Sequence, residues 1–402
     1  MKDQKIALAF SGGLDTSVIM RWLQENFNAE IVTVTGNLGQ EKELVGVREK
    51  AFELGATAAY FDDLTEEFVN DYVWHALKAG ALYEGIYPLG TALGRPLLAK
   101  ALVDAARKEG CTVVAHGCTG KGNDQVRFEA SVAALAPDLT VIAPVRHWEF
   151  TSREQEIEYC LARGIKVNAT KANPYSIDEN IWGTSIECGV LEDPTVPPPE
   201  DAYQRTVSPI AAPDAPEQVT IAFEAGIPVE VNYKKLSGVD ILKTLNVIAG
   251  LNGIGRIDLI ENRLVGIKSR EVYEAPAAFV LHAALTELER LTLDPWTVRT
   301  KHSLSPQYAD LVYNGLWFAP VRSALDAFFD EVATRLSGEV TLSLYKGTMT
   351  VQSRSSAFSL YDKALASYTE EDSYDHRAGE GFSKVHSLPL KVMGAVEHYL
   401  VP

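Results

Sequence analysis

The sequence predicts an α/β protein: a doubly wound parallel-sheet domain, then an α+β domain, then a helical C-terminal tail. Strand-length apolar runs alternate with helical patterns over about the first 165 residues. The composition shifts near residue 190, where a proline-rich stretch begins, and the pattern from Ala357 onward is mostly helical. Length alone favours about two to three domains. We place them at residues 1–165, 166–356 and 357–402.

The first domain is predicted from its alternating elements. Lys5–Phe10 is a nearly continuous apolar run, as expected of a strand buried on both faces. The further strands expected are Glu30–Gly36, Ala58–Leu64, Cys111–Gly117 and Thr140–Val145. The helices expected are Thr16–Phe27, Glu41–Leu54, Glu66–Ala79, Pro96–Lys108, Asp124–Leu135, and one that a Thr151/Glu154 capping box starts and that ends near Gly164.

The second part begins with a segment that cannot be regular helix. Leu191–Glu217 holds many of the 19 prolines of the chain. Beyond it we expect strands at Gln218–Glu224 and Ile227–Tyr233, helices at Ala277–Leu291 and Gln307–Leu336, a hairpin over Val340–Ser353 that turns at Lys346–Gly347, and a last helix at Leu388–Leu400. Helices that follow a finished domain need a surface for their apolar side, and a neighbouring subunit would provide one.

Charge and composition exclude several kinds of partner. The net charge is −17 with no run of Lys and Arg, so phosphate-rich nucleic acid would be repelled. No apolar stretch is long enough to span a bilayer, and no signal peptide is predicted, so we expect neither membrane attachment nor export. The four cysteines have no metal-type spacing and are expected to be reduced thiols. A cytoplasmic protein fits these features.

The first candidate site follows the first strand, at Ser11-Gly12-Gly13-Leu14-Asp15-Thr16-Ser17. A strand end followed by a helix N-terminus presents backbone N–H groups to an anion. The two glycines let the backbone approach that anion, and three hydroxyls lie within the same seven residues. The spacing is neither that of a Walker A loop nor that of the dinucleotide fingerprint. The alternative is a turn in which Asp15 or Thr16 only caps a helix.

Two further stretches carry polar side chains at loop positions. His116–Glu129 follows a predicted strand and offers Thr119, Asn123, Asp124 and Arg127, in the crevice where open α/β sheets bind ligands. The alternative is that Asp124 caps a helix and Arg127 lies on its solvated face. Tyr87–Pro96 is less specific, because Tyr87 could be a core aromatic and Arg95 a surface charge.

These motifs together resemble a known family. The Ser11–Ser17 stretch resembles the pyrophosphate loop of the N-type ATP pyrophosphatases, which release pyrophosphate from ATP while adenylating an oxygen. Tyr87–Pro96, His116–Glu129, Asn173–Glu187 and Gly253–Ala278 extend the likeness, in order, to argininosuccinate synthases. The resemblance implies an adenine nucleotide α-hydrolase-like fold and a typically tetrameric enzyme. Its members join citrulline to aspartate through citrullyl-AMP, releasing AMP and pyrophosphate, with ATP and Mg²⁺ required.

The resemblance also implies a role for individual residues. ATP would be bound by Ala9, Phe10, Ser11, Gly12, Gly13, Leu14, Asp15, Thr16, Ser17, Gly36 and Gly117. Aspartate would be bound by Thr119, Asn123 and Asp124. Citrulline would be bound by Tyr87, Thr91, Asn123, Arg127, Ser176, Ser185, Glu261 and Tyr273. Asp124, Arg127, Ser11 and Ser17 are the residues expected to act in catalysis. Magnesium would be held mainly through the ATP phosphates, and whether Asp15 contacts it or only shapes the loop stays open.

The chain departs from the family pattern at a few positions. Many members have Ser where this chain has Ala92, so we expect Thr91 or a water to replace that hydroxyl. Others often have alanine and aspartate where this chain has Gly36 and Asn37. The alternatives are a tRNA-thiolating ATP pyrophosphatase, which should be basic, a glutamine-dependent member, which would need a glutaminase, and a non-catalytic ATP-binding module, which should be shorter. No general base stands out; Asp124 or a nucleotide phosphate could accept the proton of the aspartate ammonium group.

Overall fold

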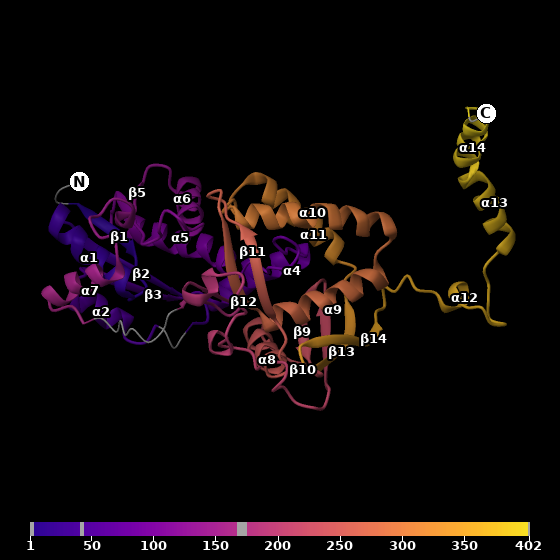
Figure 1. The fold of residues 1–402 in the computed structure, drawn as a ribbon, viewed down its shortest axis with the longest axis horizontal. Coiled ribbons are helices and arrows are strands. Elements are labelled where there is room, and N and C mark those ends of the chain that lie inside the picture. Colours follow the sequence, from indigo (N-terminus) through magenta and orange to yellow (C-terminus); the bar gives the residue numbers. More distant parts are fainter. Residues whose placement is uncertain (1–3, 41–43, 167–174, 401–402) are drawn as a thin grey trace. The chain divides into compact units, whose positions relative to one another are not determined.

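The computed structural model describes residues 4–40, 44–166 and 175–400, and the chain divides into two compact units, Met1–Phe358 and Ser359–Pro402. The first unit begins with a parallel sheet in the order β3-β2-β1-β4-β5 (Figure 1). Its strands are β1 (Lys5–Ala9), β2 (Glu30–Asn37), β3 (Ala58–Asp63), β4 (Val113–Ala115) and β5 (Thr140–Ile142). All of its strand pairs are parallel, which confirms the predicted α/β architecture.

Helices pack against both faces of this sheet because side chains of β1 alternate between them. Ile6 and Leu8 face a core built with α1 (Leu14–Phe27) and α2 (Val47–Glu53). Ala7 faces the opposite core, built with α5 (Gly90–Lys108) and α6 (Asp124–Leu135). Both faces of the central strand are therefore buried, which explains its nearly unbroken apolar sequence.

Several helices of the parallel-sheet region differ from the prediction at their starts. The helix predicted at Glu41–Leu54 begins at Val47, because Gly46 adopts φ +76° and cannot lie inside a helix; residues 41–43 are outside the described residues. α5 begins six residues before Pro96, with Ala92 and Leu93 of its early turns fully buried. The Thr151/Glu154 capping box is wrong: Ser152 caps α7 (Arg153–Ala162) by accepting the Gln155 N–H, and Gln155 Oε1 accepts the Thr151 N–H.

The segment predicted as one helix at Glu66–Ala79 forms three consecutive helical pieces. These are α3 (Thr65–Phe68), a π-helical turn (Val69–Val73) and α4 (Trp74–Ala79). Their side chains pack into the largest apolar core of the molecule, which also contains Leu281, Tyr308 and Phe329 from the second half of the chain. The ring of Tyr72, for example, stacks on Trp317 at 4.6 Å between centroids. This core therefore combines residues from both sides of the predicted domain boundary at residue 165.

Two antiparallel sheets and four helices form the rest of the first unit. One sheet has the order β10-β9-β8-β13-β14 and the other the order β11-β12-β7-β6. The strands are β6 (Ser176–Glu179), β7 (Thr184–Glu187), β8 (Glu217–Glu224), β9 (Ile227–Val231), β10 (Lys234–Lys235), β11 (Arg256–Asn262), β12 (Lys268–Glu274), β13 (Gly338–Tyr345) and β14 (Thr348–Ser355). The helices are α8 (Gly238–Leu251), α9 (Pro276–Thr292), α10 (Pro295–Tyr313) and α11 (Pro320–Ala333). The hairpin turning at Lys346–Gly347 is confirmed.

The single long helix predicted at Gln307–Leu336 is wrong. Two helices, α10 and α11, occupy this stretch, and the chain turns between them at Gly315, which has φ +74°. Pro320 then starts α11, where its missing N–H costs no helical hydrogen bond. The proline-rich segment contains two short 3-10 turns, Gly189–Glu192 and Glu200–Ala202, and no α-helix.

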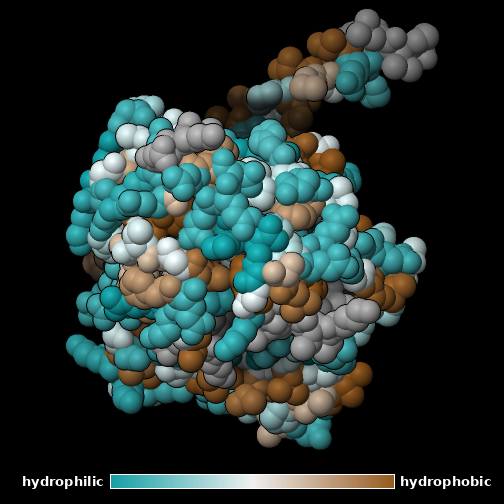
Figure 2. All heavy atoms as spheres, turned by 90° about the vertical axis from the view of Figure 1, so that its left-hand side faces the viewer, coloured by the Kyte–Doolittle hydropathy of each residue, from teal (hydrophilic) through white to brown (hydrophobic). Residues whose placement is uncertain are grey.

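The second unit consists of α12 (Lys363–Ala366), α13 (His376–His386) and α14 (Leu388–Leu400), in agreement with the predicted helical tail. Large apolar side chains of α13 and α14 are exposed, with Phe382 at 69%, Leu390 at 67% and Val396 at 53%. Within the described residues, no helix combines the length and the apolar character needed to cross a membrane. The face of the molecule that lies at the parallel-sheet end is largely hydrophilic in the space-filling view (Figure 2).

Candidate active site

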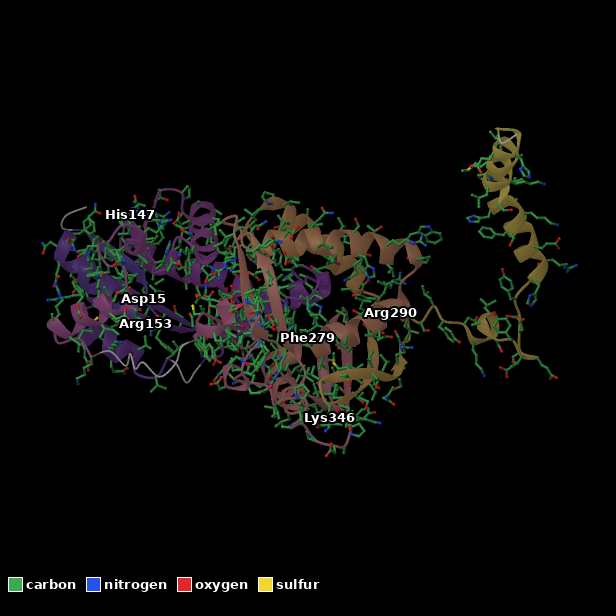
Figure 3. All side chains as sticks on the ribbon, viewed as in Figure 1. Asp15, His147, Arg153, Phe279, Arg290 and Lys346 are labelled. Atoms are coloured by element: carbon green, nitrogen blue, oxygen red, sulfur yellow. The ribbon has the colours of Figure 1, made fainter. Side chains whose placement is uncertain are left out.

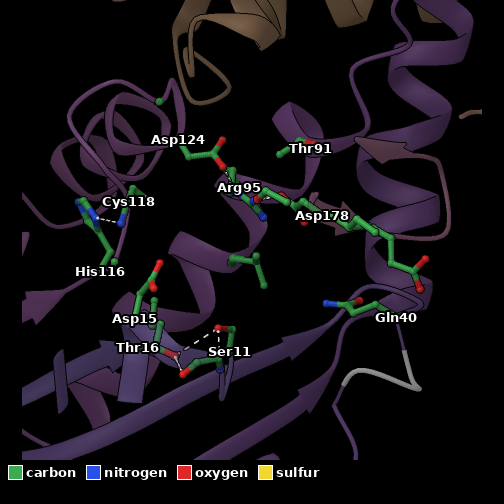
Figure 4. Close-up of a pocket in the computed structure, with 18 of the residues that line it drawn as sticks. Ser11, Asp15, Thr16, Gln40, Thr91, Arg95, His116, Cys118, Asp124 and Asp178 are labelled. Atoms are coloured by element: carbon green, nitrogen blue, oxygen red, sulfur yellow. Dashed lines mark hydrogen bonds and ion pairs between the residues drawn. The ribbon is translucent and has the colours of Figure 1, made fainter. Parts of the chain in front are cut away.

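The loop between β1 and α1 has the geometry of an anion-binding turn. Gly12 adopts φ +76°, where a side chain would be strained, and a Cβ built there would lie 3.0 Å from Val47 Cγ2 of α2, a tight contact. Gly13 precedes the first residue of α1, and its N–H donates to Ser11 Oγ at 3.3 Å. Ser11 Oγ also lies 3.2 Å from the Thr16 hydroxyl. The loop thus places two hydroxyls at the start of a helix (Figure 4).

Ser17 has a different position from the other residues of this motif. Its side chain is fully buried, and its hydroxyl donates to the Gly13 carbonyl at 2.6 Å. Ser17 is absent from the pocket lining that contains every residue from Ala9 to Thr16. In this structure its hydroxyl therefore holds the loop rather than facing the cavity.

Asp15 lies beside a second carboxyl group. The Glu156 carboxyl group of α7 interacts with the Asp15 side chain, and its buried Oε2 has no hydrogen-bond partner. Burial, together with the negative charge of Asp15, raises the pKa of Glu156 to about 8. Arg153, at the first turn of α7, lies in the same region as Asp15 and also lines the pocket (Figure 3).

One cavity of about 840 Å³ contains nearly all of the predicted site residues. Its lining combines the loop after β1, Gly36 at the end of β2, the loop before α6 and strands of the β11-β12-β7-β6 sheet. The predicted residues that line it are Ala9, Phe10, Ser11, Gly12, Gly13, Leu14, Asp15, Thr16, Gly36, Tyr87, Thr91, Gly117, Thr119, Asn123, Asp124, Arg127, Ser176, Ser185, Glu261 and Tyr273. Ala92 is buried and does not line the cavity, whereas Thr91 does.

Asp124 is held between two arginines. Its carboxylate accepts from Arg95 Nε at 2.8 Å and from Arg127 Nη1 at 2.9 Å. Arg95 also pairs with Asp178 of β6 (Figure 4). Burial alone would raise the pKa of Asp124, but the two guanidinium groups hold it below its ordinary value. Asp124 is therefore a carboxylate at neutral pH and a poor proton acceptor.

This arrangement excludes the alternative in which Asp124 caps a helix and Arg127 lies on its solvated face. Arg127 is buried, so it does not lie on a solvated helix face. Asp124 is the first residue of α6, and its side chain makes ion pairs instead of capping the helix. Arg95, whose sequence position allowed a surface charge, instead anchors Asp124 from α5.

The opposite wall of the cavity surrounds Glu261, a carboxylate that is 2% exposed at β11. Tyr273 of β12 donates to Glu261 Oε2 at 2.7 Å, and Tyr313 donates to Oε1. The Tyr273 ring stacks on Tyr87 with 3.9 Å between centroids. Burial raises the pKa of Tyr273, so its hydroxyl keeps its proton and remains a donor. A carboxylate supported in this way is suited to an ammonium group of a ligand.

Strand register places the two predicted serines near this wall. Ser185 of β7 pairs with Tyr273 of β12 on one side and with Asp178 of β6 on the other. Ser176 begins β6 and is exposed toward the same cavity. The predicted Asn173–Glu187 motif is described only from residue 175 onward. Sequence alone could not place Ser185 beside Tyr273, because that requires the strand pairing.

Several charged residues of the lining were not predicted. They are Lys50, Arg153, Asp178, Glu179, Glu187, Arg263 and Glu271, joined by Gln40, His116 and Cys118. Lys50 of α2 donates to the Gly12 carbonyl at 2.5 Å, and burial lowers the pKa of Lys50. Arg263 pairs with both Glu187 and Glu271 at 2.5 Å. The Lys50–Gly12 and Arg263–Glu187 contacts join residues that are 38 and 76 positions apart, so no local pattern signals them.

Known proteins match this chain over nearly its whole length. A family model described as the N-terminal HUP domain of arginosuccinate synthase matches residues 5–166, and one described as the C-terminal domain matches residues 175–393. The argininosuccinate synthase of Pelodictyon phaeoclathratiforme is 60% identical over 396 residues, which is 98% of this chain and 99% of that protein. Those of Chlorobium limicola and Chlorobium luteolum are 59% and 58% identical over the same length and shares. The chain therefore belongs to the argininosuccinate synthase family.

Proposed function

We propose that this chain joins citrulline to aspartate at the expense of ATP, forming argininosuccinate, AMP and pyrophosphate through citrullyl-AMP. The observation that carries the proposal is the single cavity of about 840 Å³, in which the loop after β1, Asp124 with its arginines, and Glu261 with its tyrosines all meet. Adenylation followed by displacement needs the nucleotide and both amino acids in one space, because the intermediate must be attacked before water reaches it.

The loop after β1 is proposed to hold the ATP phosphates. Ser11 and Thr16 supply hydroxyls, and Gly12 and Gly13 allow close backbone approach. Ser17 contributes indirectly by fixing the Gly13 carbonyl. Gly36 and Gly117 line the adjoining part of the cavity, where we place the rest of the nucleotide. Attack falls on the α-phosphorus, so these groups stabilise the charge on the departing pyrophosphate.

Magnesium is proposed to enter with ATP and to be held mainly through phosphate oxygens. The described residues contain no group of three or more His, Cys, Asp or Glu side chains arranged as metal ligands. The hydroxyls of Ser11 and Thr16 are oxygen donors of the kind that Mg²⁺ accepts, and they lie at the phosphate end. When bound, the ion neutralises charge on the phosphates. We assign the Asp15 carboxyl to its pair with Glu156.

The two amino acids are proposed to occupy the remaining walls. Aspartate binds at Thr119, Asn123 and Asp124, where the Asp124 carboxylate attracts its ammonium group. Because the pKa of Asp124 is lowered, we assign it to charge recognition rather than to proton removal. Citrulline binds at a set of residues that includes the cation Arg127 and the carboxylate Glu261. The full set is Tyr87, Thr91, Asn123, Arg127, Ser176, Ser185, Glu261 and Tyr273.

The assembly and cellular location belong to the same proposal. The exposed apolar side chains of α13 and α14 support a homo-oligomer, which we propose is a tetramer of the kind typical for the family. A cytoplasmic location is proposed from the composition. We retain 1–165, 166–356 and 357–402 as functional divisions for nucleotide binding, substrate binding with assembly, and oligomerisation.

Product analysis tests the function directly. The purified chain is incubated with ATP, Mg²⁺, aspartate and citrulline whose ureido oxygen carries a heavy isotope. We expect AMP and pyrophosphate to form only when citrulline is present, with the label in AMP, because the ureido oxygen bonds to the α-phosphorus. Formation of ADP and phosphate would contradict the proposal. Citrulline-independent turnover would favour another ATP pyrophosphatase, such as a tRNA-thiolating enzyme, and ATP binding without turnover would favour a non-catalytic module.

A further inference from the structure

Tyr313 contacts three of the proposed substrate ligands although it does not line the cavity. It is the last residue of α10, it is 1% exposed, and it reaches Asn123, Arg127 and Glu261. These three residues come from different parts of the chain: Asn123 precedes α6, Arg127 lies in α6, and Glu261 lies in β11. The Tyr313 side chain thus hydrogen-bonds with proposed substrate-binding residues on both walls of the cavity.

The Tyr313 hydroxyl links the two walls through hydrogen bonds. It accepts from Asn123 Nδ2 at 2.8 Å and donates to Glu261 Oε1. Burial, reinforced by the charge of Glu261, raises the pKa of Tyr313, so the hydroxyl keeps the proton that it donates. The other side of the Asn123 amide is also held, because its Oδ1 accepts the Leu264 N–H at 2.8 Å. The orientation of the amide is thus set by Tyr313 and Leu264 together.

The ring and backbone of Tyr313 hold the arginine. Arg127 Nε donates to the Tyr313 carbonyl at 2.9 Å, and its guanidinium lies 4.8 Å from the Tyr313 ring centroid. The ring is fixed on its other side by Tyr83, stacked at 3.5 Å between centroids with planes 6° apart. Gly315 allows the chain to pass closely, since a Cβ there would lie 2.7 Å from Arg127 Cα. The ring cannot shift without disturbing these neighbours.

We propose that Tyr313 is a positioning residue that fixes Glu261, the carboxylate proposed to bind citrulline, and Asn123, proposed to bind both amino acids, relative to each other. The inference rests on the proposed function. Its physical basis is that one neutral hydroxyl serves as acceptor for one ligand and donor to the other, while the same residue holds Arg127. Removal of the hydroxyl leaves the Asn123 amide held at Oδ1 by Leu264 but without an acceptor for Nδ2, and it leaves one oxygen of a buried carboxylate without its donor. Both amino-acid sites lose their geometry together, whereas the phosphate loop makes no contact with Tyr313.

The test is the Tyr313→Phe variant, which removes the hydroxyl but keeps the ring and the carbonyl contact with Arg127. Tyr308→Phe is the matched control: Tyr308 is on the same helix, is fully buried, and its hydroxyl donates to Asp326 at 2.7 Å, outside the cavity lining. KM for citrulline is measured by ATP–pyrophosphate exchange without aspartate, and KM for aspartate and ATP in the full reaction. Thermal midpoints are recorded for both variants.

We expect Tyr313→Phe to raise KM for citrulline and for aspartate about tenfold or more, the usual effect of losing a hydrogen bond to a charged group. KM for ATP should stay within about twofold, and Tyr308→Phe should leave all three KM values within about twofold even where its midpoint falls. KM values for Tyr313→Phe that match those of Tyr308→Phe would overturn the proposal. A wild-type chain without citrulline-dependent exchange would overturn the proposed function instead.

A double-mutant cycle separates coupling from coincidence. Asn123→Ala is prepared alone and with Tyr313→Phe, and KM for aspartate is compared. Because Tyr313 acts on aspartate through Asn123, the double variant should have the KM of Asn123→Ala, within about twofold. Fully multiplicative effects would show that the hydroxyl acts independently of Asn123 and would contradict the positioning role.

Discussion

At the scale of single residues, Asp124 illustrates how neighbours define chemistry. An aspartate at the start of a helix is ordinarily a cap, but here both carboxylate oxygens are used by Arg95 and Arg127. The positive charges hold its pKa below the ordinary value, which suits it to bind an ammonium group and makes it a poor base. Gly36 shows the same dependence: a Cβ there would lie 2.5 Å from Leu98 Cδ2 and 2.9 Å from Leu64 Cδ1. The space that an alanine would need is filled by these leucine side chains.

Asp124→Asn tests charge recognition at this position. The substitution keeps the size of the side chain but leaves two largely buried guanidinium groups facing a neutral amide. We expect KM for aspartate to rise about tenfold or more, and the free energy of unfolding to fall by about 2 kcal/mol. Steady-state kinetics and denaturant unfolding measure the two effects.

Asp138→Asn serves as the control because Asp138 also pairs with an arginine, Arg107, but with both side chains about half exposed or more. Surface pairs of this kind contribute little, so this variant should retain the wild-type KM and stability. An Asp124→Asn enzyme with unchanged KM for aspartate would exclude Asp124 from binding that substrate.

At the scale of elements, the packing of α7 against α1 places Glu156 beside Asp15 in the first turn of α1. Two carboxyl groups in contact share a proton when burial disfavours a second charge. The pKa of Glu156 is raised to about 8, first by burial and then by the charge of Asp15. The contact between these helices therefore depends on protonation in the neutral range.

The pH dependence of stability follows from this pair. The unfolded chain releases the Glu156 proton near its ordinary pKa of 4.5, whereas the folded chain keeps it up to about pH 8. Between these values the folded state binds more protons, so its stability falls as pH rises. Glu156→Gln should remove this loss. Between pH 5 and pH 8.5 the free energy of unfolding of the variant should therefore fall by about 1 kcal/mol less than that of the wild type, after allowance for partial solvent exposure.

Thermal unfolding at pH 5, 7 and 8.5 measures this difference. Glu158→Gln is the control, since Glu158 is exposed on the same helix. The difference between the unfolding midpoints of the two variants should increase as pH rises. Parallel pH profiles for Glu156→Gln and wild type would contradict the shared proton.

At the scale of the whole molecule, the largest core joins segments distant in the sequence. Phe68, Tyr72 and Leu77 pack in one cluster with Leu281, Tyr308 and Phe329. This packing makes residues 1–358 a single compact unit, and the same unit contains the cavity wall that carries Glu261. Residues 359–402 form a separate unit with many exposed apolar side chains, which in an isolated chain would be unfavourable.

Removal of residues 359–402 tests their role in assembly. We expect the shortened chain to form a particle with fewer subunits than the full chain, because the apolar surface of α13 and α14 is lost. Size-exclusion chromatography with light scattering gives the particle mass. Leu390→Lys in the full chain should weaken assembly in the same direction, while Lys391→Ser should not. An unchanged number of subunits per particle after truncation would place the subunit contacts elsewhere.

The sequence by itself determined the parallel sheet, the glycine-rich loop after β1 and the order of the substrate motifs. These features are local: a buried strand shows as a continuous apolar run, and a turn shows as glycines between a strand and a helix. Helix bounds predicted from the sequence are wrong at two places. α5 begins before Pro96 because its early turns are buried, and Gly315 with its positive φ divides the stretch predicted as one helix.

Only the tertiary structure decided which side chains meet in the site. Tyr313 and Asn123 are separated by 190 positions in the chain, and Lys50 reaches Gly12 across 38. Packing of the elements also brings Arg95 to Asp124, and it buries the Ser17 side chain outside the cavity. Periodicity reports what one element buries but not its partner, because many partners satisfy the same apolar face. The chemistry of the site is fixed only when packing selects one of them.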